Sequence, residues 1–181
     1  MFYMFLADGF EETEALATLD VLRRAEIEVK TVGVTGGTVT GSHNVSVVAD
    51  IDINDICING ISAVVLPGGM PGTTNLMNNQ TVLDCVVAAY NDNKPVCAIC
   101  AAPSILGELG ILNGKNATCF PGFEDKLIGA NVLSCGVVAD GNIVTAKGAG
   151  VSLEFGFKIT EIVKGKEIAN NLREIMQCNS L

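Results

Sequence analysis

Histidine is nearly absent from this 181-residue chain, which contains one histidine and seven cysteines. Because a catalytic dyad needs an imidazole beside its nucleophile, this shortage leaves few histidine-based mechanisms open. A zinc site is equally hard to assemble, since no second cysteine pair or histidine pair completes four ligands, and no metal is expected. Basic residues are also scarce, with 11 Lys and Arg against 20 Asp and Glu and a net charge of −9. Nucleic acid and anionic membranes are therefore not expected as main partners.

Long apolar runs and cofactor motifs are missing as well. No segment reaches the roughly 18 apolar residues that a membrane span requires. The apolar residues 1–7 lack a basic start and are followed by acidic residues, unlike a secretory signal. We therefore expect a cytoplasmic protein with no membrane partner, whose odd number of cysteines is mostly reduced. No G-x-G-x-x-G motif or P-loop follows a strand, and the acidic loop at residues 8–14 would repel a flavin phosphate, so flavin binding at this loop is not expected.

Apolar residues are abundant, at 49% of the chain against 17% charged residues, and the length suits one domain spanning residues 1–181. Short apolar runs alternate with helical periodicity, which is typical of a mostly parallel α/β sheet with helices on both faces. The predicted strands are 2–7, 29–34, 38–40, 45–49, 61–66, 95–99, 116–119, 132–138 and 143–146. The predicted helices are 13–25, 81–90, 102–109, 151–163 and 167–176.

Ligands of parallel α/β sheets bind at the carboxyl ends of the strands. Three segments directly follow predicted strands and carry chemically useful residues, namely 7–14, 67–72 and 100–104. The candidate functional residues are therefore expected in these three segments.

Cys100 lies at the turn between a predicted strand and a predicted helix, with Pro103 in the first helical turn. A cysteine on such an elbow projects into the cleft and feels the positive end of the helix, which predicts a lowered thiol pKa and a reactive thiolate. The amide of Ala101 is a candidate oxyanion donor. A buried structural cysteine is the alternative, and the residues alone leave both open. Cys97 falls inside the strand and points to the opposite face from Cys100, so the pair does not predict a dithiol site.

Carboxylates and glycines occupy the other two segments. Glu14 lies one turn into the predicted helix, and its pKa would be raised if it faced an apolar cleft, where it could move a proton. The alternative for Glu14 is an ordinary surface carboxylate. Gly68 and Gly69 follow a buried strand, and they form either an oxyanion-binding turn or a plain tight turn. His43 falls in a predicted hairpin loop, which is expected at the surface and away from Cys100.

Four segments resemble motifs of a known family and occur in the same order. They are ADGFEETE at residues 7–14, VVLPGG at 64–69, AICAAP at 98–103 and GAGVSLEF at 148–155. These segments are similar to motifs of the ThiJ/PfpI superfamily, in particular of its DJ-one branch and close bacterial relatives. The resemblance covers essentially the whole chain. It implies a flavodoxin-like three-layer α/β sandwich that forms a homodimer.

The resemblance also implies roles for individual residues. Cys100 would be the reactive elbow cysteine, and Glu14 would be the protonated carboxyl that hydrogen-bonds its sulfur. Gly69 and Ala101 match the backbone donors beside the sulfur. The remaining positions that match the cleft or the dimer interface are Gly68, Arg24, His43 and Phe120.

Two departures from the family pattern bear on the mechanism. The protease-like branch places a histidine directly after the cysteine, where this chain has Ala101, so peptidase activity is not expected. The animal branch has a histidine in a Thr-His-Pro stretch, and the matching stretch 118–121 has Phe120 in its place. Glu14 is then the expected proton shuttle. The roles of Cys97 and Cys119 are left unassigned.

The function that the resemblance implies is a cysteine-dependent, cofactor-free detoxification of reactive 2-oxoaldehydes, of the glyoxalase or protein deglycase type. Small reactive carbonyls or glycated protein side chains would be the partners. The alternative is an oxidative-stress sensor or redox-regulated chaperone that acts through oxidation of Cys100. A hydrolase of amides or peptides would need a histidine that cannot be placed beside Cys100.

Overall fold

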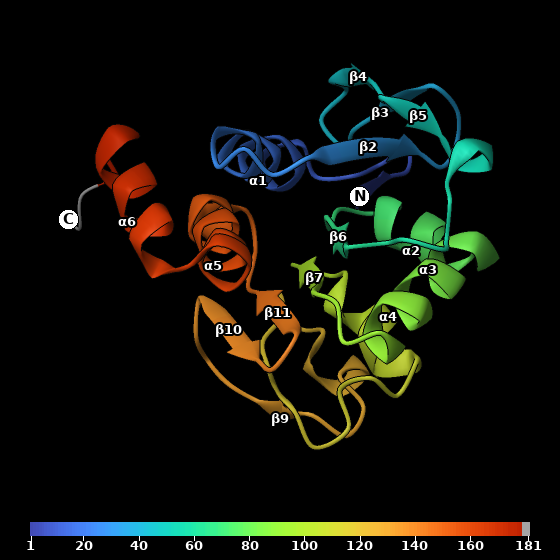
Figure 1. Cartoon of the computed structure of the whole chain (residues 1–181). Helices are drawn as coiled ribbons and strands as arrows, with labels where there is room; N and C mark the ends of the chain where they lie inside the picture. Colours follow the sequence, from blue (N-terminus) through green and yellow to red (C-terminus); the bar gives the residue numbers. More distant parts are fainter. Residues whose placement is uncertain (179–181) are drawn as a thin grey trace.

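A seven-stranded sheet runs through the computed structural model, which describes residues 1–178 (Figure 1). Its strands are β1 Phe2–Leu6, β2 Val29–Gly33, β5 Ile51–Asp52, β6 Ala63–Leu66, β7 Val96–Ile99, β10 Val137–Asp140 and β11 Ile143–Ala146. They lie in the order β10-β11-β7-β6-β1-β2-β5. Within this sheet β10 pairs antiparallel with β11, and the other neighbours are parallel. The prediction of a mostly parallel sheet is confirmed.

Helices cover both faces of this sheet (Figure 1). On one side lie α1 Glu12–Arg24, α5 Ser152–Lys164 and α6 Lys166–Ile175, and on the other lie α2 Gly72–Met77, α3 Gln80–Asn91 and α4 Pro103–Glu108. This arrangement confirms the predicted three-layer α/β sandwich. Among residues 1–178, no helix combines the length and the apolarity that crossing a bilayer requires.

The central strands are continuously apolar because each face of the sheet packs under helices. Successive side chains of a strand point to opposite faces. In β1, Tyr3 and Phe5 therefore join the apolar cluster that includes side chains of α3 and α4. Phe2, Met4 and Leu6 join the cluster that includes side chains of α1 and α5. Alternate side chains of β1 thus pack against the helices on opposite faces of the sheet.

Most predicted elements are confirmed to within two residues at each end, including the hairpin of β3 Thr38–Thr40 and β4 Ser46–Val48. The prediction of one strand at 132–138 is wrong. β9 Asn131–Val132 pairs with β8 Asn116–Ala117, whereas β10 pairs with β11. Because the two ends of the segment pair with different strands, the residues between them belong to neither strand. The sequence pattern does not predict α2 or β5, which are only six and two residues long.

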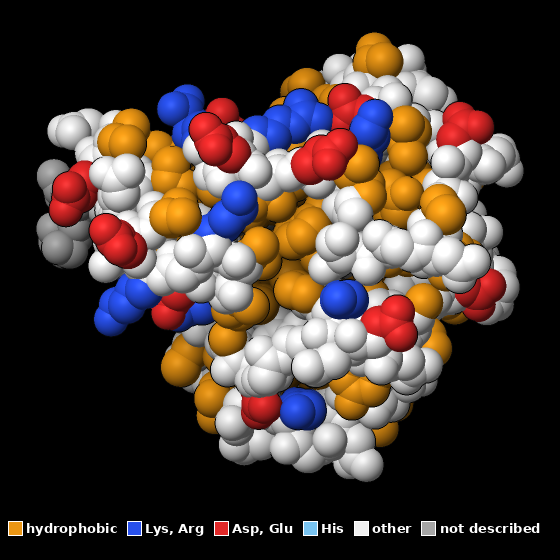
Figure 2. Space-filling view, viewed as in Figure 1, with side chains coloured by type: hydrophobic (Ala, Val, Ile, Leu, Met, Phe, Trp, Pro, Cys, Tyr) orange, Lys and Arg blue, Asp and Glu red, His pale blue; other side chains and the backbone are white. Residues whose placement is uncertain are grey.

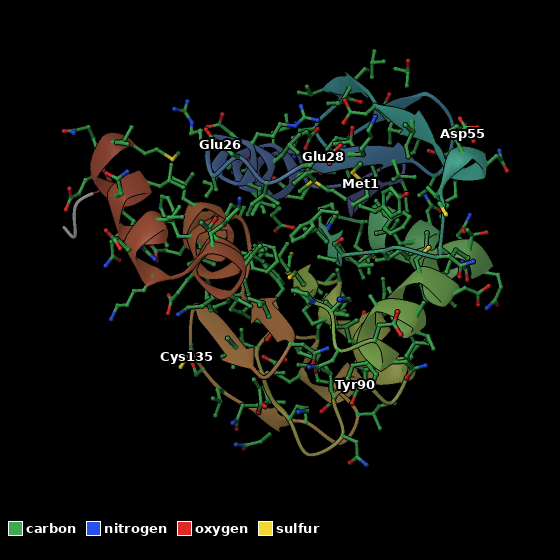
Figure 3. The ribbon with its side chains drawn as sticks, viewed as in Figure 1. Met1, Glu26, Glu28, Asp55, Tyr90 and Cys135 are labelled. Carbon is green, nitrogen blue, oxygen red and sulfur yellow. The ribbon has the colours of Figure 1, made fainter. Side chains whose placement is uncertain are left out.

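The candidate residues lie at only one end of the parallel strands. Figure 3 labels Met1, Glu26 and Glu28, which precede β1 and β2 and so mark the amino ends of these strands. On the face drawn in Figure 2, acidic and basic side chains are interspersed, and neither forms one continuous patch. The candidate residues collect at the opposite, carboxyl ends of the strands.

Candidate active site

Three neighbouring strands bring the candidate residues together. β1, β6 and β7 lie side by side and parallel, so their carboxyl ends meet at one edge of the sheet. Gly68 and Gly69 lie in the turn after β6, and Cys100 directly follows β7. The loop after β1 leads into α1, whose first turn carries Glu14. Residues that are far apart in the sequence therefore form one site.

Cys100 occupies a strained turn. Its φ of +66° lies in the left-handed region, which non-glycine residues seldom adopt and which costs roughly 1–3 kcal/mol. The Cys100 amide donates to the carbonyl of Ala146 at 2.9 Å, and the Phe120 amide donates to the carbonyl of Cys100 at 2.8 Å. These two bonds hold a half-buried thiol at the elbow between strand and helix, where the sequence predicts it.

The sulfur of Cys100 has three polar neighbours. The amides of Gly69 and Ala101 donate hydrogen bonds to it, and the side chain of Glu14 is its third hydrogen-bond partner. Glu14 is only 1% exposed, and its Oε2 accepts a hydrogen bond from the Gly68 amide at 2.8 Å. The structure therefore brings together the four residues that the family resemblance assigns to the site, with Gly68 as an additional donor to the carboxyl.

Gly68 is a glycine because no larger residue fits between the thiol and the carboxyl. A Cβ at this position would lie 2.6 Å from the Cys100 Cβ and 2.7 Å from the Glu14 Oε2. Both distances are shorter than ordinary van der Waals contacts allow. The close approach of Cys100 and Glu14 thus depends on the missing side chain of Gly68.

Burial dominates the electrostatics of this pair. It raises the pKa of Glu14 to about 7, although hydrogen bonds with Cys100 and Gly68 act in the opposite direction. Burial and the facing Glu14 carboxylate raise the pKa of the Cys100 thiol to about 12, while the amides of Gly69 and Ala101 lower it. The prediction of a lowered thiol pKa is therefore wrong. The six-residue helix α4 has a weak positive end, and burial together with the carboxylate outweighs it. The site holds a thiol beside a carboxyl that loses its proton near neutral pH.

An apolar pocket of about 370 Å³ opens beside this pair. It is lined by Phe120, Pro121, Lys147, Gly148, Ala149, Gly150 and Val151. Gly148 links the pocket to the acid, because a Cβ on it would lie 3.3 Å from the Phe120 ring and 3.9 Å from the Glu14 Oε1. The sequence pattern did not single out residues 148–151 as site residues. Their position directly after a parallel strand is the signal that points to them.

Arg24 lies away from this site. Its Nε pairs with the Asp20 Oδ2 at 2.7 Å at the end of α1, and both side chains are about half exposed. Arg24 lies ten positions after Glu14 in the same helix, which corresponds to about 15 Å along the helix axis. Of the two places expected for Arg24, the cleft or the dimer interface, the structure does not support the cleft. Its place at a dimer interface, and the homodimer itself, stay predictions.

His43 faces a different carboxylate. Its Nδ1 lies 3.0 Å from the Glu12 Oε2, and its side chain is 71% exposed. Glu12 also accepts hydrogen bonds from the amides of His43 at 2.7 Å and Val45 at 3.3 Å. Burial raises the pKa of Glu12, but these hydrogen bonds prevail and lower it to about 2. The hydrogen bond with Glu12 raises the pKa of His43. His43 thus anchors the exposed hairpin of β3 and β4 to α1, as its predicted surface position suggests.

Glu11, Glu12 and His43 also have the spacing of metal ligands. Their ligand atoms lie within 4.8 Å of one another, and residues 1–178 contain no other such group. The hydrogen bonds of Glu12 within the hairpin account for this arrangement. We therefore assign no metal to the cluster.

Comparisons with known proteins place this arrangement in context. The DJ-1/PfpI family model matches residues 2–162. Protein dj-1beta of Drosophila melanogaster is 36% identical over 167 residues, which cover 91% of this chain and 89% of the fly protein. Protein DJ-1 homolog B of Arabidopsis thaliana is 38% identical over 165 residues, but the chain spans only 37% of the length of that plant protein. The structure of Toxoplasma gondii DJ-1, oxidized, has a TM-score of 0.93 at 30% identity and is covered over 97% of each chain.

Proposed function

This chain belongs to the DJ-1/PfpI family, and we propose that it converts reactive 2-oxoaldehydes to 2-hydroxy acids without a cofactor. Cys100 is the nucleophile in this proposal, and Glu14 is the proton shuttle. The observation that carries it is the buried Glu14 carboxyl, which is hydrogen-bonded to the Cys100 thiol and has a pKa of about 7. A base with a pKa near the working pH is the most effective kind of proton shuttle.

The first step is attack of the Cys100 sulfur on the aldehyde carbon. The thiol proton passes to the ionised Glu14 as the S–C bond forms. This transfer matters because the pKa of the free thiol is too high for a standing thiolate at neutral pH. The amides of Gly69 and Ala101 donate to the sulfur in the free protein, so in this proposal they are next to the carbon that the sulfur attacks. They are placed to donate to the developing oxyanion, and protonation of that oxygen by Glu14 completes a hemithioacetal.

The second step moves hydrogen between the two substrate carbons. Glu14, again ionised, removes the proton from the carbon bound to sulfur, which gives an enediol, and returns a proton to the neighbouring carbon. The hydroxyl proton of the carbon bound to sulfur passes to the oxygen of the neighbouring carbon, so that the first carbon becomes a carbonyl and the second carries the hydroxyl. The product is a thioester of a 2-hydroxy acid. Water then cleaves the S–C bond and releases the acid with a free thiol. The balance is one 2-oxoaldehyde and one water for one 2-hydroxy acid, so no external oxidant is required. Glycated protein side chains carry the same carbon as an aminocarbinol or hemithioacetal; they are a second class of substrate in this proposal when the adduct bond breaks, which frees the side chain and regenerates the aldehyde that Cys100 attacks.

Lactate formation from methylglyoxal tests this proposal. Cys100→Ala and Glu14→Gln should each abolish turnover, because one removes the nucleophile and the other the proton acceptor. Cys57→Ala and Glu12→Gln are matched controls, since Cys57 is an exposed cysteine and Glu12 is a carboxylate of the same helix turn that faces His43 instead of Cys100. Unchanged turnover in Cys100→Ala or in Glu14→Gln would rule out this mechanism.

A second proposal is that Cys100 acts as an oxidative-stress sensor, with or without a linked chaperone activity. The same three neighbours of the sulfur that would serve catalysis could hydrogen-bond the oxygens of a sulfinate. A relative in this family, Toxoplasma gondii DJ-1, has been solved in a form described as oxidized. Mild peroxide treatment followed by peptide mass spectrometry tests the idea. Because the neighbouring Glu14 carboxylate can accept the thiol proton, Cys100 should oxidise faster than the exposed Cys135 and the buried Cys85, and equal rates would contradict the idea.

Peptide hydrolysis is not proposed. The only histidine of the chain is His43, which pairs with Glu12 on the exposed hairpin. Ala101 follows the cysteine and supplies a backbone amide but no side-chain base.

A further inference from the structure

The wall of the pocket beside Cys100 is formed by an aromatic ring. Phe120 is 47% exposed, and its ring packs against the position where Gly148 lacks a side chain. The Phe120 amide donates to the carbonyl of Cys100 at 2.8 Å, so the backbone of the ring-bearing residue is tied to the nucleophile itself. The pocket that the Phe120 ring lines is therefore next to the backbone of the nucleophile.

The pocket is larger than the smallest substrates need. Its volume is about 370 Å³, and a cavity of about 150 Å³ already accommodates a benzene molecule. The methyl group of methylglyoxal would leave most of this space to water. A phenyl or branched alkyl group would displace that water from apolar walls, which is favourable in proportion to the area covered.

The chemistry of the walls agrees with their size. Of the lining side chains only Lys147 is charged, and it is exposed. The others are the aromatic Phe120, the aliphatic Val151, and proline, alanine and glycine residues. A polar substituent would find few hydrogen-bond partners among these side chains, whereas an apolar one loses nothing by entering.

We propose that this pocket selects 2-oxoaldehydes whose second substituent is aromatic or bulky and apolar, and that Phe120 is the residue that sets this preference. The inference rests on the proposed function, because it names the substrate class of the same site. Phe120 takes the place of the histidine expected from the animal branch, so its ring supplies packing where an imidazole would supply a base.

The kinetic experiment compares phenylglyoxal with methylglyoxal from initial rates in the wild type, Phe120→Ala and Phe120→Leu. The ratio of the two kcat/KM values within each variant removes any general loss of activity. Phe120→Ala should lower kcat/KM for phenylglyoxal by about tenfold or more relative to methylglyoxal, which is the size of effect expected from lost apolar contact in a pocket. Phe120→Leu should fall between. Ile128→Ala is the matched control, because Ile128 is also exposed, at 59%, and lies outside the pocket.

A second readout does not depend on turnover. Phenacyl chloride and chloroacetone both alkylate thiols: an S–C bond forms, the C–Cl bond breaks, chloride leaves and Glu14 accepts the thiol proton. Peptide mass spectrometry follows labelling at Cys100 apart from the exposed Cys57 and Cys135. Rates are divided by those for free glutathione to remove intrinsic reactivity. The wild type should favour phenacyl chloride, and Phe120→Ala should lose about tenfold of that preference.

The two readouts separate the two proposals. Absence of 2-hydroxy acid formation with a Phe120-dependent alkylation preference would overturn the proposed function and leave the pocket assignment standing. Turnover of both aldehydes with the same ratio in the wild type and Phe120→Ala, together with equal losses for both alkylating reagents, would overturn the role of Phe120 and leave the proposed function standing.

Discussion

Two carboxyl groups in the first turn of α1, those of Glu12 and Glu14, have pKa values shifted in opposite directions. Glu12 and Glu14 are both buried, at 8% and 1% exposed, and burial raises the pKa of each. Glu12 meets the imidazole and amide of His43 and the amide of Val45, and its pKa falls to about 2. Glu14 meets one amide and a thiol, and its pKa rises to about 7. The residue type and the helix are the same, so the difference comes from the hydrogen-bond donors that the fold brings to each carboxyl.

This difference separates a structural role from a chemical one. A carboxylate with several donors stays ionised at every physiological pH and can only hold neighbouring groups in place. A carboxyl with too few donors to offset its burial changes protonation near neutral pH, as a proton shuttle must. Glu12 therefore fastens the hairpin of β3 and β4 to α1, whereas Glu14 is available to Cys100. Two isosteric substitutions, Glu12→Gln and Glu14→Gln, test this division directly.

The largest expected effect is on catalysis. Because the ionised form of Glu14 accepts the thiol proton, kcat/KM of the wild type should rise with pH up to about 7 and then level off. Glu14→Gln should remove this inflection and lower kcat/KM by about 10²–10⁴, the range expected for a lost general base. Measured pH–rate profiles of 2-hydroxy acid formation provide the check.

Glu12→Gln is the control for that profile. It should keep the inflection near pH 7 and most of the activity, because Glu12 is already ionised far below this range. If Glu12→Gln lost the inflection and Glu14→Gln kept it, the assignment of the two roles would be reversed.

The next effect is on stability and follows from the raised pKa of Glu14. The folded state keeps the proton between the ordinary value of 4.5 and about 7, so the wild type loses stability as pH rises through this window. The loss is on the order of 3 kcal/mol when complete. Glu14→Gln stays neutral and avoids it, so the variant should match the wild type near pH 4.5 and be more stable at pH 8. Urea unfolding at both pH values measures the gap, and a gap that is the same at both would contradict a buried, titrating Glu14.

The strands and the elbow were predictable from the sequence because they depend on local patterns. β6 and β7 are continuous apolar runs that end in glycine or cysteine turns, and such runs indicate strands buried on both faces. The position of Cys100 directly after β7 then follows from the geometry of parallel sheets. The prediction of one strand at 132–138 was wrong because the two ends of this apolar run pair with different strands, which a local pattern does not reveal.

The electrostatics of the site could not be predicted from local patterns. The lowered thiol pKa expected for Cys100 considers only the helix that follows it. The dominant influences are burial and the Glu14 carboxylate, which reaches the sulfur from helix α1 across the gap left by Gly68. Phe120 presents the same difficulty, because its place next to the site depends on a backbone hydrogen bond to Cys100, which is far away in the sequence. The family resemblance supplied the pairing of Glu14 with Cys100, and the residues alone did not.

The smallest expected effect is on stability through Glu12, which fastens the hairpin of β3 and β4 to α1. Glu12→Gln should lower the free energy of unfolding by about 1.5–3 kcal/mol at pH 7, because hydrogen bonds to a charged acceptor are replaced by weaker neutral ones. The folded pKa of Glu12 lies below its ordinary value of 4.5, so its contribution is complete above 4.5 and is lost as pH falls toward about 2. The difference in the free energy of unfolding between wild type and variant should therefore narrow from pH 5 to pH 3.

His43→Gln is the matched control, since it removes the exposed imidazole but keeps the backbone amide that donates to Glu12 at 2.7 Å, and it should lower the free energy of unfolding by less than Glu12→Gln does. Urea unfolding across this pH range decides the matter: a difference that does not change with pH would show that Glu12 acts through packing, and its contrast with Glu14 would then rest on shape instead of charge.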